Sequence, residues 1–396
     1  MRYVQHIENN MVIQIDGTNS KNKGAELMFY AIAQEIARKH PSAVIRYVGS
    51  PVPVNYFKIN NKIIVPWYNN CKFRNLLRRL HIEAIFDCFI KGYYRNCYFN
   101  NMTDIVFDAS GLRISDKFGE NYYRAKRFGW YLKKIHRNGV FLIFLPQAFG
   151  PLENSTSRKM IGSISAYANV VIARDDISYK YLLDECEIAN LWKYPDFTNL
   201  VDGVIPPDFS CDADYITVIP NTRMITQNII TAEGYYEMLS IVIEQCLGAN
   251  KDVIILNHAD HEDAVICQKL AEKYKLRYLS GYNALEIKGI ISKGYLTISS
   301  RFHGVANSLN SGVPCLATSW SHKYEKLFED YAQKDCILSI NNIDVVRNKL
   351  TEMLDEKMNK KYRTNLLGAI SKNKAQTQEM WNIIWDAWEK FDKGLS

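Results

Sequence analysis

Short apolar runs rich in β-branched residues alternate with longer amphipathic segments along most of the 396-residue chain. The first unit consists of the apolar run 11–15, a polar loop and the amphipathic run 25–40. Apolar runs of similar length recur at residues 43–48, 104–107, 140–145 and 170–173. Strand patterns that alternate with helix patterns are typical of βαβ units and a parallel sheet. The alternation therefore predicts an α/β fold.

The alternation breaks once, at residues 203–214, where two adjacent prolines stand in a stretch without helical periodicity. It then restarts, with predicted strands at 215–219, 253–256, 295–298 and 314–318. Because a domain of about 150 residues is typical, a chain of this length accommodates two. We predict an N-terminal Rossmann-like domain over 1–202, a linker over 203–214, a C-terminal Rossmann-like domain over 215–345 and a helical segment over 346–396. Open α/β sheets bind ligands beyond the carboxyl ends of their strands, so we expect a shared ligand in a central cleft that both domains face.

The C-terminal segment carries Trp381, Trp385 and Trp388 at the i, i+4 and i+7 positions of a helical pattern. Residues at this spacing lie on one helix face. An aromatic face of this kind suits packing better than ligand binding, so we expect the C-terminal helix to pack across a domain surface.

The charge balance narrows the class of partner. Lys and Arg number 49 and Asp and Glu 42, which gives a formal net charge of +7. This mild excess suits an anionic small molecule or an anionic membrane surface. Nucleic acid is not expected, because no recognised binding module accompanies the charge.

Cysteine usage and hydropathy bear on location. The nine cysteines form no CxxC pair, and those in apolar segments, such as Cys246, Cys267 and Cys315, are typical of reduced core thiols in a cytosolic protein. The N-terminus has no apolar core of a secretory signal, and the longest apolar stretch, 140–146, is far shorter than the ~20 residues of a spanning helix. We expect a cytoplasmic protein, either free or attached peripherally to the inner face of the cytoplasmic membrane.

Residues 297–314, TISSRFHGVANSLNSGVP, carry the strongest functional signal. A predicted strand ends at Ser300, a turn carries Arg301 and His303, and a helix begins near Gly304. Cationic side chains beside the N–H groups of a helix N-terminus favour anion binding, and the glycine lets a ligand approach the backbone closely. The alternative is a buried histidine bonded to backbone. We favour the functional interpretation, because sites gather where strands lead into helices.

Two further cations follow predicted strands. Lys323 comes after the strand 314–318 and is expected at the same sheet edge as His303, although a solvated surface lysine has the same spacing. Arg174 follows the strand 170–173 and precedes two acids that complement the dipole of the next helix. A guanidinium at that place fits a planar carboxylate through two hydrogen bonds.

Other strand-end loops contain small polar residues and glycine. The loop 16–26 is neither a P-loop nor a GxGxxG turn. Small polar residues and glycine favour turns, which is enough to explain the composition of any single loop of this kind. A series of such loops at successive strand ends indicates a ligand site. Candidate ligand-binding or supporting residues in these loops are Asn19, Asn22, Gly24, Glu26, Asp108 and Gln147.

No HExxH motif or cysteine cluster is present, and we expect no metal site. His258 and His261 follow a predicted strand, and we interpret them as parts of an ordinary polar loop. Basic and aromatic residues interleave at 72–95 and 124–137. Such segments suit an anionic membrane leaflet, and a solvated helix face over the core explains them equally well.

Several of these motifs occur together in one known family. In chain order they are GTNSKNKGAELM, FDASG, LPQAFGP, ARDDIS, YPDF, SSRFHGVANSLNSGVP and SHKYEKL. Over residues 11–330 the chain thereby resembles the polysaccharide pyruvyl transferase family. The resemblance implies a two-domain GT-B-type fold. It also implies transfer of pyruvate from phosphoenolpyruvate to a sugar, which leaves a cyclic carboxyethylidene ketal.

The resemblance implies roles for site residues as well. The Arg, His and Lys that the family uses for its donor match Arg174, His303 and Lys323, our candidate catalytic residues. No cofactor is implied beyond phosphoenolpyruvate as the donor substrate. The implied acceptor is a sugar of a capsule or other cell-surface polysaccharide, or its lipid-linked precursor. The candidate donor-binding residues are Ser300, Arg301 and Gly304.

The first loop departs from the family's commoner Asn-x-Gly-Asp-Glu pattern by reading Asn-Lys-Gly-Ala-Glu, which removes an acid at position 25 and keeps Glu26. Glu26 and Asp108 are candidates for the base that deprotonates the sugar hydroxyl. His303 is either the acid that protonates the donor or a ligand of its phosphate. Two other functions stay open: a GT-B glycosyltransferase with a nucleotide-sugar donor, and a non-catalytic glycan-binding or assembly subunit.

Overall fold

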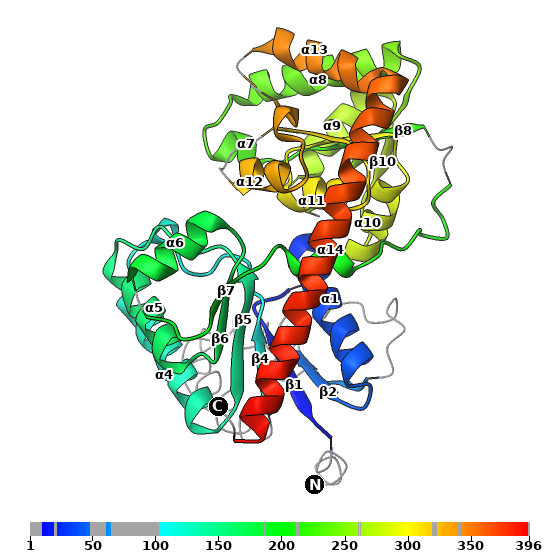
Figure 1. The fold of residues 1–396 in the computed structure, drawn as a ribbon. Helices are drawn as coiled ribbons and strands as arrows, with labels where there is room; N and C mark the ends of the chain where they lie inside the picture. The colour runs from blue at the N-terminus through cyan, green and yellow to red at the C-terminus, as the bar shows by residue number, and fades with distance from the viewer. Residues whose placement is uncertain are drawn as a thin grey trace, which may run out of the picture. The chain divides into compact units, whose positions relative to one another are not determined.

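The chain folds into two compact units in a computed structural model, which describes residues 10–19, 22–47, 61–64, 103–185, 187–210, 214–259, 261, 263–318, 323–338, 340 and 342–394. Unit 1 comprises residues 1–20, 25–200 and 376–396, and unit 2 comprises residues 21–24 and 201–375. Each unit contains a parallel sheet flanked by helices (Figure 1). The predicted α/β class is therefore confirmed.

Over its described residues, unit 1 has one parallel sheet with the strand order β3-β2-β1-β4-β5-β6-β7. The predicted strands of this half are confirmed to within two residues at each end, and the short strands β3 and β7 were not predicted. The strands are β1 (Val12–Asp16), β2 (Val44–Tyr47), β3 (Ile63–Ile64), β4 (Ile105–Asp108), β5 (Phe141–Gln147), β6 (Val170–Ala173) and β7 (Leu191–Lys193).

Helices cover both faces of this sheet. One face packs against α4 (Tyr122–Arg137), α5 (Ser155–Tyr167) and α6 (Asp176–Glu185), whose buried residues form one cluster with β4, β5 and β6. On the other side of the sheet lie α1 (Lys23–Lys39) and the C-terminal part of α14 (Glu356–Asp392) (Figure 1). Strands that are buried on both faces read as continuous apolar runs, which explains why these runs predicted the strands so well.

Unit 2 contains a second parallel sheet, whose described strands have the order β10-β9-β8-β11-β12-β13. All four strands predicted for this half are confirmed, and the short strands β10 and β13 were not predicted. The strands are β8 (Tyr215–Ile219), β9 (Asp252–Leu256), β10 (Arg277–Leu279), β11 (Leu296–Ser299), β12 (Cys315–Thr318) and β13 (Ile337–Leu338).

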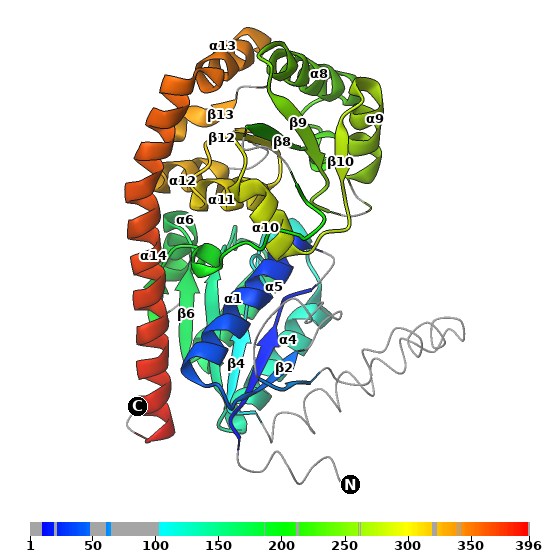
Figure 2. The same cartoon turned by 90° about the vertical axis from the view of Figure 1, so that its right-hand side faces the viewer.

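Helices α8 and α13 lie side by side over unit 2 (Figures 1 and 2), where Gln245 Nε2 donates to Thr351 Oγ1 at 2.7 Å. Cys246, Cys267 and Cys315 are buried in the main core of this unit, and burial raises the pKa of Cys246 to about 12. The described helices of the unit are α7 (Arg223–Thr226), α8 (Ala232–Gly248), α9 (Ala264–Tyr274), α10 (Ala284–Ser292), α11 (Phe302–Asn310), α12 (Lys323–Asp330) and α13 (Ile343–Leu354).

The stretch that the sequence suggests as a linker is described over residues 203–210, where it packs as part of unit 2. Val204 N donates to Leu285 O at 2.9 Å, at the start of α10. A Cβ on Gly203 would come within 2.3 Å of the backbone nitrogen of Gly289. These contacts explain why the compact unit 2 begins at Val201, before the two prolines.

The tryptophans of α14 pack on unit 1 as predicted. Trp381 and Trp385 are each 1% exposed, and their rings meet Phe107 of β4 edge to face. Trp385 Nε1 also donates to Glu35 Oε1 of α1 at 2.8 Å, which satisfies the buried indole N–H. Trp388 contacts Phe141 of β5. The C-terminal helix thus completes the core of unit 1.

Trp385→Ala should lower the free energy of unfolding of the protein by about 3–5 kcal/mol, because it leaves a large cavity and removes a hydrogen bond to the buried Glu35 carboxylate. Leu183→Ala is the control, since Leu183 lies on α6 of the same unit and is 56% exposed; it should change the value by less than about 0.5 kcal/mol. Urea unfolding followed by tyrosine and tryptophan fluorescence and by circular dichroism measures both. Equal losses in the two variants would contradict the packing described for α14.

Candidate active site

Arg301 and His303 stand at the start of α11, directly after β11. Arg301 is the N-cap of the helix and has an extended backbone, with φ −98° and ψ 126°. Its N–H donates to Ser299 Oγ at 3.1 Å, and the Ser299 hydroxyl donates to the Arg301 carbonyl at 3.0 Å. A Cβ on Gly304 would lie 2.5 Å from Ser299 Oγ, so this turn requires the glycine. The predicted strand–turn–helix arrangement is present, with the helix starting two residues earlier than expected.

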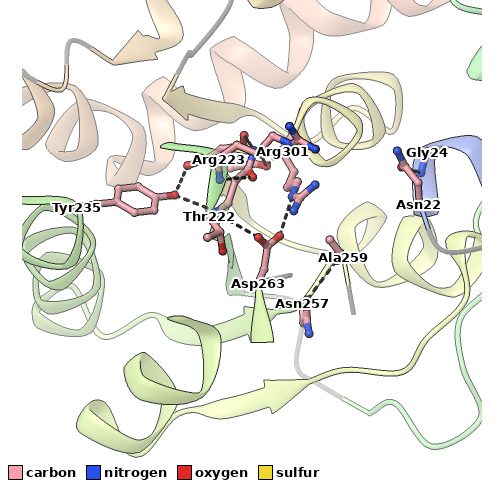
Figure 3. A network of polar contacts seen from close by, with 12 residues as sticks. Asn22, Gly24, Thr222, Arg223, Tyr235, Asn257, Ala259, Asp263 and Arg301 are labelled. Carbon is pink, nitrogen blue, oxygen red and sulfur yellow. Dashed lines mark hydrogen bonds and ion pairs between the residues drawn. The ribbon is translucent and has the colours of Figure 1, made fainter. Parts of the chain in front are cut away.

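The Arg301 side chain forms an ion pair with Asp263, a residue that sequence reasoning missed (Figure 3). Arg301 Nε donates to Asp263 Oδ2 at 2.6 Å, and Asp263 is fully buried. Asp263 Oδ1 accepts from Thr222 N at 2.9 Å. An aspartate in front of a helix predicts only an N-cap, and in this helix its side chain makes no capping hydrogen bond.

Ser300 connects three strand ends of unit 2. Its hydroxyl lies 2.6 Å from both Tyr235 Oη and Thr318 Oγ1, and its carbonyl accepts from Asn221 Nδ2 and Tyr324 Oη, each at 2.8 Å. Burial raises the pKa of the Tyr235 phenol, which keeps that group a neutral donor and acceptor. These bonds fix the edge from which Arg301 and His303 project.

His303 is half-buried in the first turn of α11, and its ring meets Phe302 edge to face. Residues 21–24 belong to unit 2, and a Cβ on Gly24 would lie 2.0 Å from His303 Nδ1. The structure therefore brings together two predicted site residues that are 279 positions apart in the sequence. Gly24 N also donates to Asn22 Oδ1 at 3.0 Å, which shapes the entry into α1.

His258 corrects one interpretation from the sequence. Its neighbour in that loop, His261, is exposed, whereas His258 is 4% exposed at the end of β9. Burial, followed by the positive charges of His303, Arg301 and Lys23, lowers the pKa of His258 well below its ordinary value. His258 therefore belongs to the electropositive surroundings of the α11 start, and it is neutral at pH 7.

Lys323 is the first residue of α12, which follows β12. Because β11 and β12 are parallel neighbours, their following helices both begin at the carboxyl edge of the sheet. The side chain of Lys323 lies outside the described part, so its predicted contact with the donor stays a prediction.

Two aspartates mark the corresponding edge of unit 1. Asp16 and Asp108 are register partners at the ends of β1 and β4, and both are buried. Asp108 accepts from Ser110 Oγ at 2.6 Å and from Arg113 Nη1 at 2.5 Å. Asp16, which sequence reasoning did not select, accepts from Tyr131 Oη at 2.5 Å. Glu26, in the first turn of α1, is fully buried and accepts from the Tyr30 hydroxyl at 3.3 Å.

Arg174 follows β6 and pairs with Asp196, whose Oδ2 lies 3.6 Å from Arg174 Nη1. Arg174 N donates to the carbonyl of Gln147, the last residue of β5. Gln147 is buried, and its side-chain Nε2 has no hydrogen-bond partner within the described residues. Such an orphaned donor is uncommon in a protein interior and is a natural contact for a bound ligand. Asp175 accepts from Ser178 N, which explains this acid as a helix cap.

The structure thus places the predicted residues in two groups, each within its own unit. One group in unit 2 contains Ser300, Arg301, His303 and Gly304, together with Asn22 and Gly24. The other, in unit 1, contains Glu26, Asp108, Gln147 and Arg174, and it includes Asn19, which is partly buried in the loop after β1. Within the described residues no group of three or more His, Cys, Asp or Glu is arranged to hold a metal ion.

Gly17→Ala should destabilise the protein because Gly17 has φ +83° and its Cβ would lie 2.3 Å from Ser110 Oγ and 2.6 Å from Ser110 N. Gly139→Ala is the matched control, with φ +68° and no atom within 4 Å of the added Cβ. Both variants share the cost of a left-handed alanine, roughly 1 kcal/mol. The close approach of the β1 and β4 ends should cost Gly17→Ala about 1–3 kcal/mol more in urea unfolding. Equal free energies for the two variants would exclude that close approach.

Comparison with known proteins adds to this geometry. Solved structures with a similar fold include the UDP-GlcNAc 2-epimerase of Methanocaldococcus jannaschii, with a TM-score of 0.57 at 11% identity over 94% of this chain and 99% of that one. The UDP-N-acetylglucosamine 2-epimerase of Rickettsia bellii gives 0.55 at 13% identity over 97% and 98%. The trehalose-6-phosphate synthase OtsA gives 0.56 at 9% identity over 96% and 99%. At these identities the likeness shows the fold alone, and it confirms the GT-B-type fold of two Rossmann-like domains.

No curated protein matches the sequence. The family model described as polysaccharide pyruvyl transferase matches residues 22–322, a span that includes the α11 start and most of both sheets. Since this match covers most of the chain, the protein belongs to the polysaccharide pyruvyl transferase family.

Proposed function

We propose that the protein transfers pyruvate from phosphoenolpyruvate to a pair of sugar hydroxyls, forming a cyclic carboxyethylidene ketal and releasing phosphate. Membership of the family supports a transferase of polysaccharide biosynthesis. The observation that carries the choice of donor is the start of α11, where Arg301 and His303 stand at a helix N-terminus beside Gly304. A small, strongly anionic enol phosphate is the kind of ligand that such a site attracts.

We assign the phosphate of the donor to Arg301 and Lys323, and His303 is either a third phosphate ligand or the acid. We assign the carboxylate of the donor to Arg174, because its planar guanidinium matches a carboxylate through two parallel hydrogen bonds. Gln147, whose carbonyl accepts from Arg174 N, offers its side-chain Nε2 as a further donor. Glu26 or Asp108 is the proposed base for the acceptor hydroxyl.

The proposed reaction has two additions. The methylene carbon of the donor takes a proton, and the central carbon becomes oxocarbenium-like. His303 is the acid that supplies this proton, unless it is instead a ligand of the phosphate. One sugar hydroxyl adds to that carbon, the carbon–oxygen bond to phosphate breaks, and the second hydroxyl closes the ketal. Of the two hydroxyl protons, one is balanced by the new methyl group and the other leaves with phosphate. No cofactor enters this balance.

His303→Ala should abolish phosphate release from phosphoenolpyruvate while leaving the circular dichroism spectrum unchanged. His261→Ala is the control, because His261 is an exposed histidine of the same unit, and it should keep wild-type turnover. Normal turnover of His303→Ala would refute the assignment of the donor site.

Arg174→Lys should lower kcat/KM at least about a hundredfold, since a point charge does not replace bidentate binding of a carboxylate. Arg158→Lys is its control, because the Arg158 side chain is 58% exposed on α5.

The same assay separates the rival functions. A glycosyltransferase on this fold releases a nucleoside diphosphate from a nucleotide sugar, and a non-catalytic subunit releases neither product. Mass spectrometry of candidate lipid-linked glycans after incubation with phosphoenolpyruvate tests the acceptor, since ketal formation adds the mass of pyruvate less one water. Release of a nucleoside diphosphate, without such a mass gain, would favour the glycosyltransferase.

The acceptor is proposed to be a sugar of a cell-surface polysaccharide such as a capsule, or its lipid-linked precursor, at the cytoplasmic face of the membrane. No described helix combines the length and apolar character needed to cross a bilayer.

We propose that α4 makes peripheral contact with the membrane, because it carries six Lys and Arg residues and no acid. Tyr123 and Trp130, on the side of α4 away from its buried residues, are 74% and 48% exposed. Exposed aromatic rings among basic residues suit an anionic interface. The other basic segment, 72–95, lies outside the described residues.

Lys126→Glu/Arg127→Glu/Lys133→Glu should weaken binding to vesicles of phosphatidylglycerol and phosphatidylcholine by roughly a hundredfold, at about 1 kcal/mol for each basic residue. Lys357→Glu/Lys360→Glu/Lys361→Glu, which changes three exposed lysines of α14, is the matched control and should bind like wild type. Vesicle sedimentation at two salt concentrations measures both. Equal binding of the two triple variants would exclude α4 as the membrane contact.

A further inference from the structure

Asp263 stands at the N-terminus of α9, but its side chain does not cap that helix. It is the N-cap of α9, with φ −102° and ψ −4°, yet its carboxylate makes no capping hydrogen bond to that helix. It is also fully buried, and an ionised carboxylate in an interior needs partners that replace water. Both carboxylate oxygens find those partners in other loops of unit 2.

Each oxygen of Asp263 contacts a different strand end. Oδ1 accepts from the backbone N–H of Thr222, in the loop between β8 and α7, at 2.9 Å. Oδ2 accepts from Nε of Arg301, in the turn between β11 and α11, at 2.6 Å. Figure 3 shows the Arg301 guanidinium directed at this carboxylate. Since β8 and β11 are parallel neighbours, Asp263 ties together the loops that leave two adjacent strands.

Different residues hold the main chain and the side chain of Arg301. Ser299 holds the main chain, because its Oγ accepts from the Arg301 N–H and its hydroxyl donates to the Arg301 carbonyl. The long side chain of an arginine carries substantial rotamer entropy, and the Asp263 carboxylate restrains this one through Nε. The fork formed by the two terminal Nη atoms is the part of a guanidinium suited to a phosphate or a carboxylate.

We propose that Asp263 is a positioning residue, which holds Arg301 in the rotamer that binds the anionic donor and anchors it to the β8–α7 loop. The proposal rests on the proposed function and extends it to a residue that does not touch the donor. The role predicts that Asp263 acts on the donor only through Arg301. Its loss should therefore weaken donor binding only while Arg301 is present.

A double-mutant cycle with phosphoenolpyruvate as the titrant tests this role. Isothermal titration calorimetry measures the donor Kd of wild type, Asp263→Asn, Arg301→Ala and the double variant. We expect Asp263→Asn to raise Kd about tenfold or more, and the double variant to match Arg301→Ala alone. Steady-state kinetics should show the loss in KM for the donor and leave KM for the acceptor unchanged.

Two further variants keep the test independent of folding. Arg301→Lys retains the charge and leaves the buried aspartate intact, but it lacks Nε, so its donor Kd should approach that of Arg301→Ala. Asp335→Asn is the control for loss of an ion pair in unit 2. Asp335 pairs with Lys349 just before β13, at the amino edge of the sheet and so opposite to Arg301. It should leave the donor Kd unchanged, and thermal unfolding of every variant reports its stability.

The outcomes separate the role of Asp263 from the function. Wild-type protein that binds phosphoenolpyruvate, together with an unchanged Kd for Asp263→Asn or Arg301→Lys, would overturn the positioning role and leave the function standing. An additional loss from Asp263→Asn in the Arg301→Ala background would also overturn it, because Asp263 would then act by another route. Wild-type protein that does not bind phosphoenolpyruvate would overturn the proposed function and the role of Asp263 together.

Discussion

Burial of the strands on both sheet faces is the constraint on which the rest of the structure depends. Every residue of β1, β4, β5 and β6 is buried, and so is every residue of β8, β11 and β12. Such strands have no exposed face on which to place reactive groups. Polar side chains are therefore concentrated in the loops at the carboxyl ends. That one constraint accounts for the places of Asp108, Arg174, Arg301 and His303.

The strand order of each sheet then selects which loops carry the chemistry. In unit 1 the chain places β2 and β3 on one side of β1 and β4 on the other, and in unit 2 it places β9 and β10 on one side of β8 and β11 on the other. Ligands of open α/β sheets bind where the order reverses in this way. The reversal in unit 1 carries the carboxylates Asp16 and Asp108, whereas that in unit 2 carries Arg301 and His303. Acids suit the activation of a sugar hydroxyl, and cations suit an anionic donor.

The sequence predicted what depends on local pattern, and it missed what depends on tertiary contact. Continuous apolar runs identified the long strands, and the spacing of three tryptophans identified the packed face of α14. The strand–turn–helix pattern at Arg301 was also readable, because strand end, cation and glycine follow one another directly. The role of Asp263 could not be predicted from the sequence, since an aspartate before a helix is sufficiently explained as a cap. The burial of His258 could not be predicted either, because it depends on contacts with other loops and not on the residues next to it in the sequence.

The course of α14 has a consequence for how the protein is made. Residues 376–396 belong to unit 1, and Trp381 and Trp385 pack there against Phe107. When the first 200 residues leave the ribosome, the aromatic layer over β4 is still missing, and it arrives only after all of unit 2 has been synthesised. The N-terminal unit therefore cannot finish folding first, in contrast to the usual vectorial order of multidomain proteins.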